Sequence, residues 1–331
     1  MASAIMVGLG HQALSEHIPA LLRRKDIRIV GACDPNPDAR ALFLRLFPEL
    51  APSVPTYDNL RELLDKTRPT MAIIAVPHDC YLDIIRDLCR RRIYFLKEKP
   101  LARNLSEAQT ILAIPGFAKY GFIATQRRHS SLYQKAQLSL KDLGKPYLFT
   151  AVYKLNIESP HAGWRGSAER AGGGCLIDMG YHIIDQMLWW FGMPQELTAH
   201  ISALAVPDAT YDAEDTATIS FQYQSGMHGV ILLSRAAGEK REEYSVYGQH
   251  GYLEGTKRRL AIYDRHNYQH NHIDHDAAEA MNDAQLDFFI NRVQKEMNFI
   301  DVQQQHLENM RFIARCLDPT LEKLSVSTVS S

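Results

Sequence analysis

Apolar positions in the first 126 residues alternate between short continuous runs and runs with helical spacing. The short runs predict strands at residues 4–7, 27–33, 71–76, 93–96 and 121–125. The helical spacing predicts helices between these strands, at residues 14–22, 37–47, 59–66 and 81–91. Because strands that alternate with helices pair in parallel and are covered on both faces, this part of the chain predicts an α/β domain.

The rest of the chain has a different pattern, dominated by strands with one apolar face. Strands are expected at residues 147–154, 196–204, 216–223, 226–235 and 242–247, and helices at 133–143, 277–295 and 302–317 and in an apolar stretch that ends at Phe191. The helix at 277–295 has an apolar face, which we expect to pack against this sheet, made of Leu286, Phe289, Ile290 and Val293. The pattern predicts two domains, at 1–126 and 127–331, the second an α+β domain with a largely antiparallel open sheet, and the length of 331 residues favours this division.

Composition narrows the class of protein. Hydrophobic residues make up 46% and charged residues 23% of the chain, values typical of a soluble globular protein. A net charge of -1 gives no reason to expect nucleic acid or an anionic membrane as a partner, so a small molecule is expected. The chain shows neither an apolar run long enough to span a membrane nor a secretory signal. The odd number of cysteines, five without C-x-x-C spacing, favours reduced thiols in the cytoplasm.

A glycine motif follows the first expected strand. Gly8, Gly10 and Ala13 form a G-x-G-x-x-A pattern between that strand and a helix, with His11 inside it. The first glycine permits a tight turn, the second lets the backbone approach a pyrophosphate, and the alanine keeps the helix close to the strand. Helix N-terminal amides bind phosphate groups, so the motif predicts a Rossmann dinucleotide-binding domain.

Asp34 directly follows the second expected strand, where a carboxylate accepts hydrogen bonds from the adenosine ribose of a dinucleotide. Its charge would repel a 2′-phosphate, and Pro35–Pro37 supplies no adjacent arginine to attract one. NAD is therefore favoured over NADP as cofactor. The alternative is that Asp34 only caps the helix at residues 37–47.

Two loops follow later strands of the expected parallel sheet, Pro77-His78-Asp79 and Lys97-Glu98-Lys99-Pro100. Ligands bind beyond the carboxyl ends of such strands, so both loops are candidates for the site. A lysine there can stabilise the developing negative charge on a substrate oxygen. The alternative is a lysine that is only solvated.

The most informative stretch runs from Gly172 to Asp185. At helical spacing, Asp178, His182 and Asp185 share one face, and a histidine with a carboxylate one turn away is suited to proton transfer near neutral pH. The alternative is an ordinary Asp–His pair that satisfies a helix. The preceding Gly172–Gly174 run indicates that a ligand or a packed neighbour comes close to the backbone. Cys175, next in the chain, is expected to be a small buried hydrophobe.

Two further segments contain candidate ligand residues. The irregular loop 156–170 contains His161, Trp164 and Arg165, each a candidate for substrate contact. The other segment has four histidines within ten residues, which invites a metal interpretation but has irregular spacing, so we expect a solvated loop and no metal; these are His266, His270, His272 and His275.

Taken together, these motifs resemble the glucose-fructose oxidoreductase/inositol dehydrogenase (Gfo/Idh/MocA) family over essentially the whole chain. Four motifs occur in the family's order: Gly8–Ala13, Cys33–Pro37, Glu98–Pro100 and Gly172–Asp185. The first two are found across dinucleotide enzymes, whereas the last two in combination are typical of this family. One departure is Tyr81, because many members have a histidine four residues after the proline that corresponds to Pro77.

The resemblance implies roles for individual residues. Lys99, Asp178 and His182 would be catalytic, with His182 as the general base and the other two orienting and polarising the substrate hydroxyl. The cofactor would contact the glycine motif, Asp34 and two loops, that is Gly8, Gly10, His11, Ala13, Asp34, Pro77, Glu98, Lys99 and Pro100. The substrate would contact the catalytic residues and a second set, Arg128, His161, Trp164 and Arg165, of which Trp164 could equally be part of the core.

The resemblance also implies an activity and an assembly. The expected function is NAD-dependent hydride transfer between a secondary alcohol of a sugar, sugar derivative or cyclitol and nicotinamide, in either direction. The alternatives are an NAD-assisted glycosidase and a catalytically silent NAD-binding regulatory protein. Members of the family commonly associate through the open sheet face, so a homo-oligomer, a dimer or tetramer, is implied. Tyr247–Gly255 resembles the family's glycine turn, although a plain hairpin explains it as well.

Overall fold

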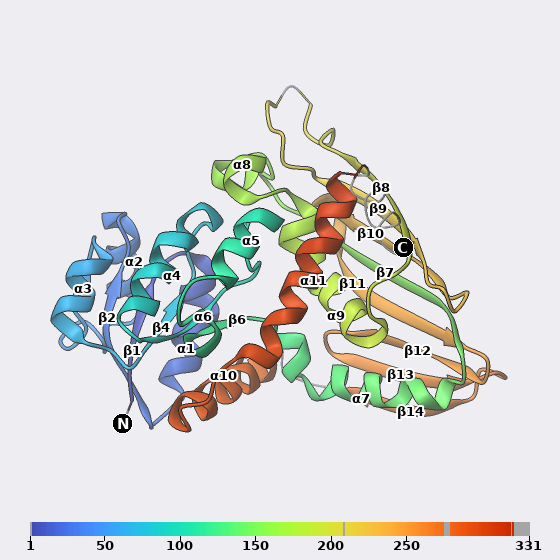
Figure 1. The fold of residues 1–331 in the computed structure, drawn as a ribbon, viewed down its shortest axis with the longest axis horizontal. Coiled ribbons are helices and arrows are strands. Elements are labelled where there is room, and N and C mark those ends of the chain that lie inside the picture. The colour runs from blue at the N-terminus through green and yellow to red at the C-terminus, as the bar shows by residue number, and fades with distance from the viewer. Residues whose placement is uncertain (1, 208, 275–278, 319, 321–331) are drawn as a thin grey trace, which may run out of the picture. The chain divides into compact units, whose positions relative to one another are not determined.

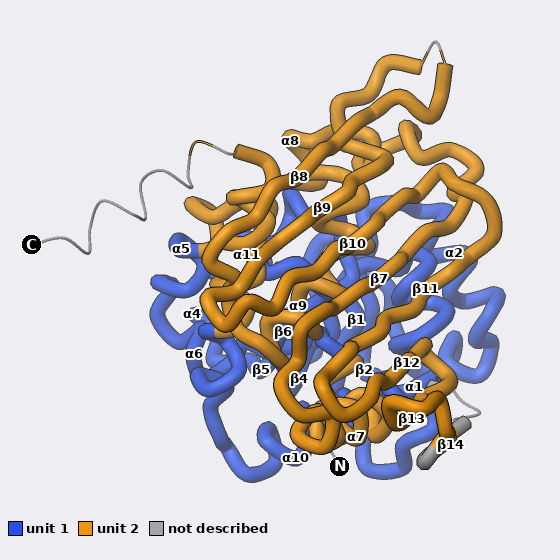
Figure 2. Tube along the Cα trace, turned by 90° about the vertical axis from the view of Figure 1, so that its right-hand side faces the viewer, with its two compact units in different colours: residues 1–101, 109–126, 279–304 blue, residues 102–108, 127–278, 305–331 orange. Residues whose placement is uncertain are grey.

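The computed structural model describes residues 2–207, 209–274, 279–318 and 320. The chain divides into two compact units, which have different colours in Figure 2. Unit 1 consists of residues 1–101, 109–126 and 279–304, and unit 2 of residues 102–108, 127–278 and 305–331. Residues 279–304 therefore belong to the same unit as the N-terminal part of the chain.

Unit 1 contains a six-stranded parallel sheet. Its strands are β1 (Ala2–Val7), β2 (Ile27–Cys33), β3 (Thr56–Tyr57), β4 (Met71–Ile74), β5 (Tyr94–Lys97) and β6 (Gly121–Ile123). They lie in the order β3-β2-β1-β4-β5-β6, so the strand order reverses between β1 and β4. Every residue of β4 and β5 is buried, as is typical of strands with both faces covered. The predicted Rossmann fold is confirmed.

Helical segments follow each of the first five strands of this sheet, and α10 joins the unit from a distant part of the chain. They are a π-helical segment (Ala13–His17), α1 (Ile18–Leu22), α2 (Pro37–Leu46), α3 (Leu60–Thr67), α4 (Tyr81–Arg90), α5 (Leu105–Leu112), α6 (Phe117–Tyr120) and α10 (Glu279–Gln294). The side-chain oxygens of Asn36 and Asn59 cap α2 and α3 by accepting hydrogen bonds from the backbone N–H groups of Asp38 and Arg61. The elements β3, α5 and α6 were not predicted. With two and four residues, β3 and α6 are too short to show a period.

Helix α10 contributes to the core of unit 1. Its apolar face packs in one cluster with residues of the parallel sheet such as Met6 and Ile73; the helix residues are Leu286, Phe289, Ile290 and Val293. The prediction that this face covers the second sheet is wrong. The helical period shows that a face is apolar, but it does not show which of two sheets the face meets.

Unit 2 contains an eight-stranded sheet. Its strands are β7 (Pro146–Asn156), β8 (Glu196–Ser202), β9 (Thr216–Gln222), β10 (His228–Ser234), β11 (Ala236–Gly248), β12 (Gly251–Thr256), β13 (Arg259–Asp264) and β14 (Gln269–Asp274). The order is β14-β13-β12-β11-β7-β10-β9-β8, and only β7 and β10 pair in parallel among these described strands. The largely antiparallel sheet is confirmed. Tyr247–Gly255 spans the β11–β12 hairpin.

The histidine-rich segment is not the loop that we expected. His270 and His272 lie in β14, which pairs with β13, and His266 lies in the turn between these strands. His275 is outside the described residues. Neither strand was predicted: β14 is mostly polar and shows no apolar alternation, and β13 has an apolar run of only four residues, 260–263.

One face of the unit 2 sheet is covered by helices and the other is open. Along β10, Ile231 and Leu233 are buried, whereas Val230 and Leu232, which alternate with them, are 37% and 39% exposed. Figure 1 shows α7 (Ser131–Ser139) and α9 (Tyr181–Phe191) on one side of the sheet, and Figure 2 shows the opposite side, with no described helix of unit 2 in front of it. The remaining helices are α8 (Ala168–Ala171), in unit 2, and α11 (Ile300–Leu317). Residues 300–304 of α11 belong to unit 1 and residues 305–317 to unit 2. No helix in the described ranges has the length and apolarity to cross a membrane.

Candidate functional site

The glycine turn of unit 1 lies where three strand ends meet. Gly8 has φ +89°, and a Cβ there would be 2.3 Å from the carbonyl oxygen of Ala75, so only glycine fits. The Gly8 N–H also donates a 2.8 Å hydrogen bond to the Cys33 carbonyl. The turn after β1 is thereby fixed against the ends of β2 and β4, beside the point where the strand order reverses.

Gly10 has a different environment. A Cβ at Gly10 would have no neighbour within 4 Å, and both Gly10 and His11 are exposed. Their backbone N–H groups lie at the start of the helix that contains Ala13, which is fully buried. Open backbone donors at a helix N-terminus fit a pyrophosphate, so the residues present match what a dinucleotide requires.

The Asp34 carboxylate connects this turn to the end of β2. It accepts hydrogen bonds from the N–H of Leu9 at 2.8 Å and of Asn36 at 2.9 Å. The cap of α2 is Asn36, so capping by Asp34 is not the explanation for this carboxylate. Arg40 donates to the Asp34 carbonyl at 2.6 Å, which places a guanidinium near the carboxylate. The sequence showed no adjacent arginine because Arg40 lies one helical turn further on.

The loop after β5 is held by two buried ionisable side chains. The Glu98 carboxylate is hydrogen-bonded to His17, whose Nε2 lies 2.7 Å from Glu98 Oε1. The Glu98 side chain is 13% exposed and the His17 side chain 7%. Burial by itself raises the pKa of Glu98, but the hydrogen bond and charge of His17, together with Lys99 and Lys97, hold the pKa below its usual value. His17 ends the π-helical segment that follows the glycine turn, so this pair connects the turn to the lysine loop.

Lys97, the last residue of β5, lies directly before this loop and was not among the predicted site residues. Its side chain is fully buried, and its ammonium donates to the carbonyl oxygens of Glu98, at 2.8 Å, and of Pro100. The ammonium also lies 3.5 Å from the centroid of the Tyr81 ring, which stacks with His78 on the loop after β4. Lys99 is half-buried, and the Lys99–Pro100 peptide bond is cis. The two lysines therefore have different environments, which the sequence did not distinguish.

In unit 2 the glycine run packs against protein backbone. A Cβ at Gly172 would lie 2.2 Å from the Arg103 carbonyl oxygen, and one at Gly174 would lie 1.8 Å from that of Glu214. The Glu214 carboxylate accepts hydrogen bonds from the N–H groups of Gly174, at 2.7 Å, and Leu176, at 2.9 Å. Of the two explanations that we considered, close packing accounts for Gly172 and Gly174. Sequence reasoning missed Glu214 because it lies 40 residues away on another segment.

Asp178 lies in a π-helical segment, Leu176–Gly180, that leads directly into α9. A π turn changes the register, so the count of 100° per residue does not hold across this stretch, and such turns are frequent at functional sites. The Asp178 carboxylate lies 3.5 Å from Arg165 Nε, and Arg165 stacks over Trp164, 4.4 Å from its ring centroid. The structure thus brings the loop candidates Trp164 and Arg165 together with Asp178, and His182 is half-buried in the first turn of α9.

Asp185 has a different role from Asp178. Its buried carboxylate accepts two hydrogen bonds from Arg128, at 2.8 and 2.9 Å, and one from Asn309 at 2.7 Å. Arg128, which the family resemblance implies as a substrate contact, directs its guanidinium fork to this carboxylate and lies over Trp189. This bidentate pair is a structural connection between α9 and the segment before α7.

Arg127 contacts the backbone of His182, the candidate base. It donates to the backbone carbonyl of His182 at 3.3 Å, to the Gln186 side chain at 2.7 Å and to Glu242 on β11. Arg127 is 3% exposed, and the Glu242 side chain is 7% exposed. The pair links α9 to the sheet, and it could not be predicted because 115 residues separate the partners.

Cys175 and His161 complete the candidates. Burial raises the pKa of the Cys175 thiol, which is fully buried as expected for a small hydrophobe. His161 is half-buried, with its ring centroid 6.1 Å from that of Tyr211. Within the described residues, no three His, Cys, Asp or Glu side chains are grouped as a metal site would require.

Two segments match known protein families. Residues 3–115 match the oxidoreductase family with an NAD-binding Rossmann fold, and residues 133–254 match the GFO/IDH/MocA C-terminal domain. Among curated proteins, the rhizopine catabolism protein MocA of Rhizobium meliloti is 24% identical over 235 residues, which are 70% of this chain and 70% of that protein. Other curated relatives match over about half of their own length, 51% and 49% in two cases.

Solved structures with the same fold are more distant in sequence. Levoglucosan dehydrogenase, solved with NADH and levoglucosan, has a TM-score of 0.79 and 15% identity, and the match covers 95% of this chain and 97% of that one. A 3-ketoreductase from Actinomadura kijaniata, solved with NADP and TDP-benzene, has a TM-score of 0.81 and 15% identity, with coverages of 95% and 96%. At these identities the likeness shows the fold alone.

Proposed function

Because the chain belongs to the Gfo/Idh/MocA family of oxidoreductases, we propose that it transfers a hydride between nicotinamide and a secondary alcohol of a sugar, sugar derivative or cyclitol. The observation that supports this most is the arrangement at the strand-order reversal of unit 1. An open glycine turn, the Asp34 carboxylate and the Glu98–Lys99–Pro100 loop follow β1, β2 and β5 of one parallel sheet. The names of two solved neighbours, a levoglucosan dehydrogenase and a 3-ketoreductase, support a sugar-like substrate.

The catalytic roles fall to Lys99 of unit 1 and to Asp178 and His182 of unit 2. In the oxidation direction His182 accepts the hydroxyl proton as general base, and Lys99 stabilises the oxygen as negative charge develops on it. The nicotinamide of the cofactor supplies the hydride acceptor. Asp178 orients the hydroxyl and the imidazole, and its contact with Arg165 at 3.5 Å makes the loop 156–170 part of the substrate site. In the reduction direction His182 returns the proton.

NAD is the proposed cofactor. The Asp34 carboxylate lies beside the glycine turn, where it accepts the hydrogen bond from the Leu9 N–H. A carboxylate at this end of the site disfavours the 2′-phosphate of NADP by like-charge repulsion. Arg40 is the one opposing feature, and its guanidinium is engaged with the Asp34 and Pro35 carbonyls.

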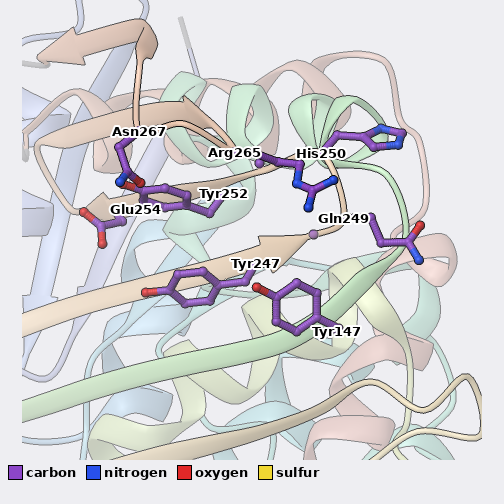
Figure 3. Close-up of a pocket in the computed structure, with 10 residues that line it drawn as sticks. Tyr147, Tyr247, Gln249, His250, Tyr252, Glu254, Arg265 and Asn267 are labelled. Carbon is purple, nitrogen blue, oxygen red and sulfur yellow. The ribbon is translucent and has the colours of Figure 1, made fainter.

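The open face of the unit 2 sheet is the proposed contact between two copies of the chain. On β10 it exposes the apolar side chains of Val230, at 37%, and Leu232, at 39%. A pocket of about 790 Å³ lies on this unit. Among the residues that line it, Figure 3 shows Tyr147, Tyr247 and Tyr252 beside polar residues such as Arg265. Tyr247 and Tyr252 stack with ring centroids 5.5 Å apart. A sheet face of this kind that no described helix covers is typical of a subunit interface.

The activity is tested by incubating the purified chain with NAD or NADP and a panel of sugars, sugar derivatives and cyclitols. The expected result is formation of reduced cofactor with at least one polyol, faster with NAD than with NADP. Release of free sugar from glycosides without net reduced cofactor would instead indicate an NAD-assisted glycosidase. Cofactor binding without turnover on the whole panel would indicate a regulatory protein and would reject the proposed activity.

A further inference from the structure

Two lysines lie where β5 ends and the following loop begins, and only one of them has a proposed catalytic role. Lys97, at the end of β5, is fully buried, whereas Lys99 is half-buried. Both belong to unit 1, as do the other residues of the network, so their contacts lie within one compact unit. A buried ammonium in a protein core is costly unless polar groups surround it, so its presence requires a reason.

The contacts of Lys97 supply that reason. Its ammonium donates to the carbonyl oxygens of Glu98 and Pro100. One carbonyl belongs to the peptide group directly before Lys99, and the other belongs to the residue directly after it. A single charged donor therefore fixes the backbone on both sides of Lys99, and with it the direction in which the Lys99 side chain leaves the loop.

Tyr81 holds the Lys97 ammonium from the other side. The ammonium lies 3.5 Å from the ring centroid of Tyr81, which is 1% exposed and is the first residue of α4. Desolvation strengthens the attraction between a cation and an aromatic face. This contact gives a physical explanation for Tyr81, the residue at which the chain departs from the histidine that many family members have.

The Glu98 side chain anchors the same loop at a second point. Its carboxylate lies 2.7 Å from His17 Nε2, and His17 belongs to the π-helical segment after the glycine turn. Two interactions therefore hold the backbone on either side of Lys99. The Glu98 side chain is bonded to His17, and the Lys97 ammonium, which lies against the Tyr81 ring, binds the Glu98 and Pro100 carbonyls.

We propose that Lys97 is a positioning residue for Lys99 and that the Tyr81 ring keeps the Lys97 ammonium in place. The proposal rests on the proposed function, because Lys99 is its catalytic lysine. Lys97 acts through the backbone and does not contact substrate.

Two substitutions and two controls test it. Lys97→Met removes the charge at nearly constant length, and Tyr81→Leu removes the aromatic face. Tyr81→Phe keeps that face, and Lys119→Met removes an exposed lysine that also lies over a tyrosine, 5.6 Å from the Tyr120 centroid in the same unit. The measurements are kcat and KM on the best substrate, the Kd of NAD, and hydrogen exchange of the Lys99 and Leu101 amides.

Lys97→Met is expected to lower kcat by about 10- to 100-fold, the scale of a misplaced catalytic group, with the Kd of NAD unchanged and faster exchange at both amides. Tyr81→Leu should change kcat and exchange in the same direction and less strongly, whereas Tyr81→Phe and Lys119→Met should match the wild type. A merely structural role would change thermal stability without this separation of kcat from NAD binding.

Wild-type kcat and wild-type amide exchange in both Lys97→Met and Tyr81→Leu would overturn the proposal. If Lys97→Met does not fold, the comparison of Tyr81→Leu with Tyr81→Phe decides the question. If the wild type turns over no substrate, the proposed function fails, while the exchange measurements still show whether Lys97 and Tyr81 fix the backbone around Lys99.

Discussion

Individual residues in this chain acquire their roles from their neighbours more than from their type. Asp178 and Asp185 are two turns apart on one helical stretch, yet Asp178 meets an arginine that is half exposed on a loop, and Asp185 is sealed between Arg128 and Asn309. The Asp178 side chain is 20% exposed, whereas that of Asp185 is 2% exposed. The same contrast separates Lys99 from Lys97 in the other unit.

His182→Ala tests the proposed base. Loss of a general base lowers turnover by about 100-fold or more, so kcat in the substrate panel should fall by at least that factor. The Kd of NAD should remain at the wild-type value, because the cofactor contacts proposed above belong to unit 1. Asp185→Asn is a poor substitute for this test, since it removes a structural ion pair. Wild-type turnover in His182→Ala would exclude the residue as the base.

Asp34→Ala tests the choice of cofactor. Removal of the carboxylate abolishes its repulsion of a 2′-phosphate, so the ratio of kcat/KM for NAD to that for NADP should fall about tenfold or more. Asp34→Asn is the matched variant, because it keeps an acceptor for the Leu9 N–H and removes only the charge. Arg40→Met should shift the ratio in the opposite direction. An unchanged ratio in both Asp34 variants would remove this residue from the cofactor site.

At the scale of elements, two glycine motifs of similar appearance do different things. At Gly10, at the start of one helix, there is open space where a side chain would be. At Gly174, at the start of another helix, the backbone of Glu214 occupies that space. In the second case a buried carboxylate then satisfies the N–H groups that a helix start leaves without partners. One motif is suited to a ligand and the other to packing.

Gly174→Ala and Gly10→Ala separate these two functions. A Cβ at Gly174 would lie 1.8 Å from the Glu214 carbonyl oxygen, so this variant should lower the free energy of unfolding by about 3 kcal/mol or more, as overpacking does. Gly10→Ala should unfold at the wild-type temperature and bind NAD more weakly. Thermal unfolding and NAD titration of both proteins check the prediction, which is wrong if their effects are exchanged.

The Arg128–Asp185 pair predicts a pH dependence. Burial by itself raises the pKa of Asp185, but Arg128, followed by His306 and Asn309, lowers the pKa below the ordinary value of 3.8. A carboxyl whose pKa is lower in the folded state stabilises the protein above its unfolded pKa, and this contribution is lost as the pH falls through the folded pKa. Asp185→Asn should thus cost about 3 kcal/mol at pH 7, and the difference from wild type should shrink below pH 4 in denaturant titrations. A constant difference across this range would contradict the assignment.

At the scale of the whole molecule, each unit contributes part of the proposed chemistry, and the second unit also presents a surface. Unit 1 holds the dinucleotide turn and the lysine loop, and unit 2 holds Asp178 and His182. The open face of the unit 2 sheet exposes residues from several strands at once, which a single strand pattern does not reveal. On this face the exposed apolar side chains of Val230 and Leu232 are suited to self-association.

Leu232→Asp tests the proposed self-association. A charge in the centre of an apolar interface is strongly unfavourable, so this variant should elute at the mass of one chain where the wild type elutes as a dimer or tetramer. Leu138→Asp is the control, because Leu138 is 63% exposed on α7 of the same unit. Light scattering coupled to size-exclusion chromatography measures the masses. A wild type with the mass of one chain, or an unchanged mass in Leu232→Asp, would reject this face as the contact.

The sequence by itself determined the features that depend on neighbouring residues. Both ends of β2 and the first residue of α4 were predicted at the residues that the structure shows. The parallel Rossmann sheet followed from the alternation of strands and helices. The glycine turn and the position of Asp34 were also evident, because a turn and the strand end beside it are local features. The same motifs pointed to the family that the comparisons show.

The tertiary structure alone decided which distant partners meet. Glu214 under the Gly174 backbone, Arg127 behind His182, Tyr81 over Lys97 and the return of α10 to unit 1 all join segments that the chain order separates. Hydrophobic period and residue type describe what a face can bury, but the choice of partner depends on the packing of the whole unit. The roles of the two lysines could therefore be distinguished only after folding brought α4 against the end of β5.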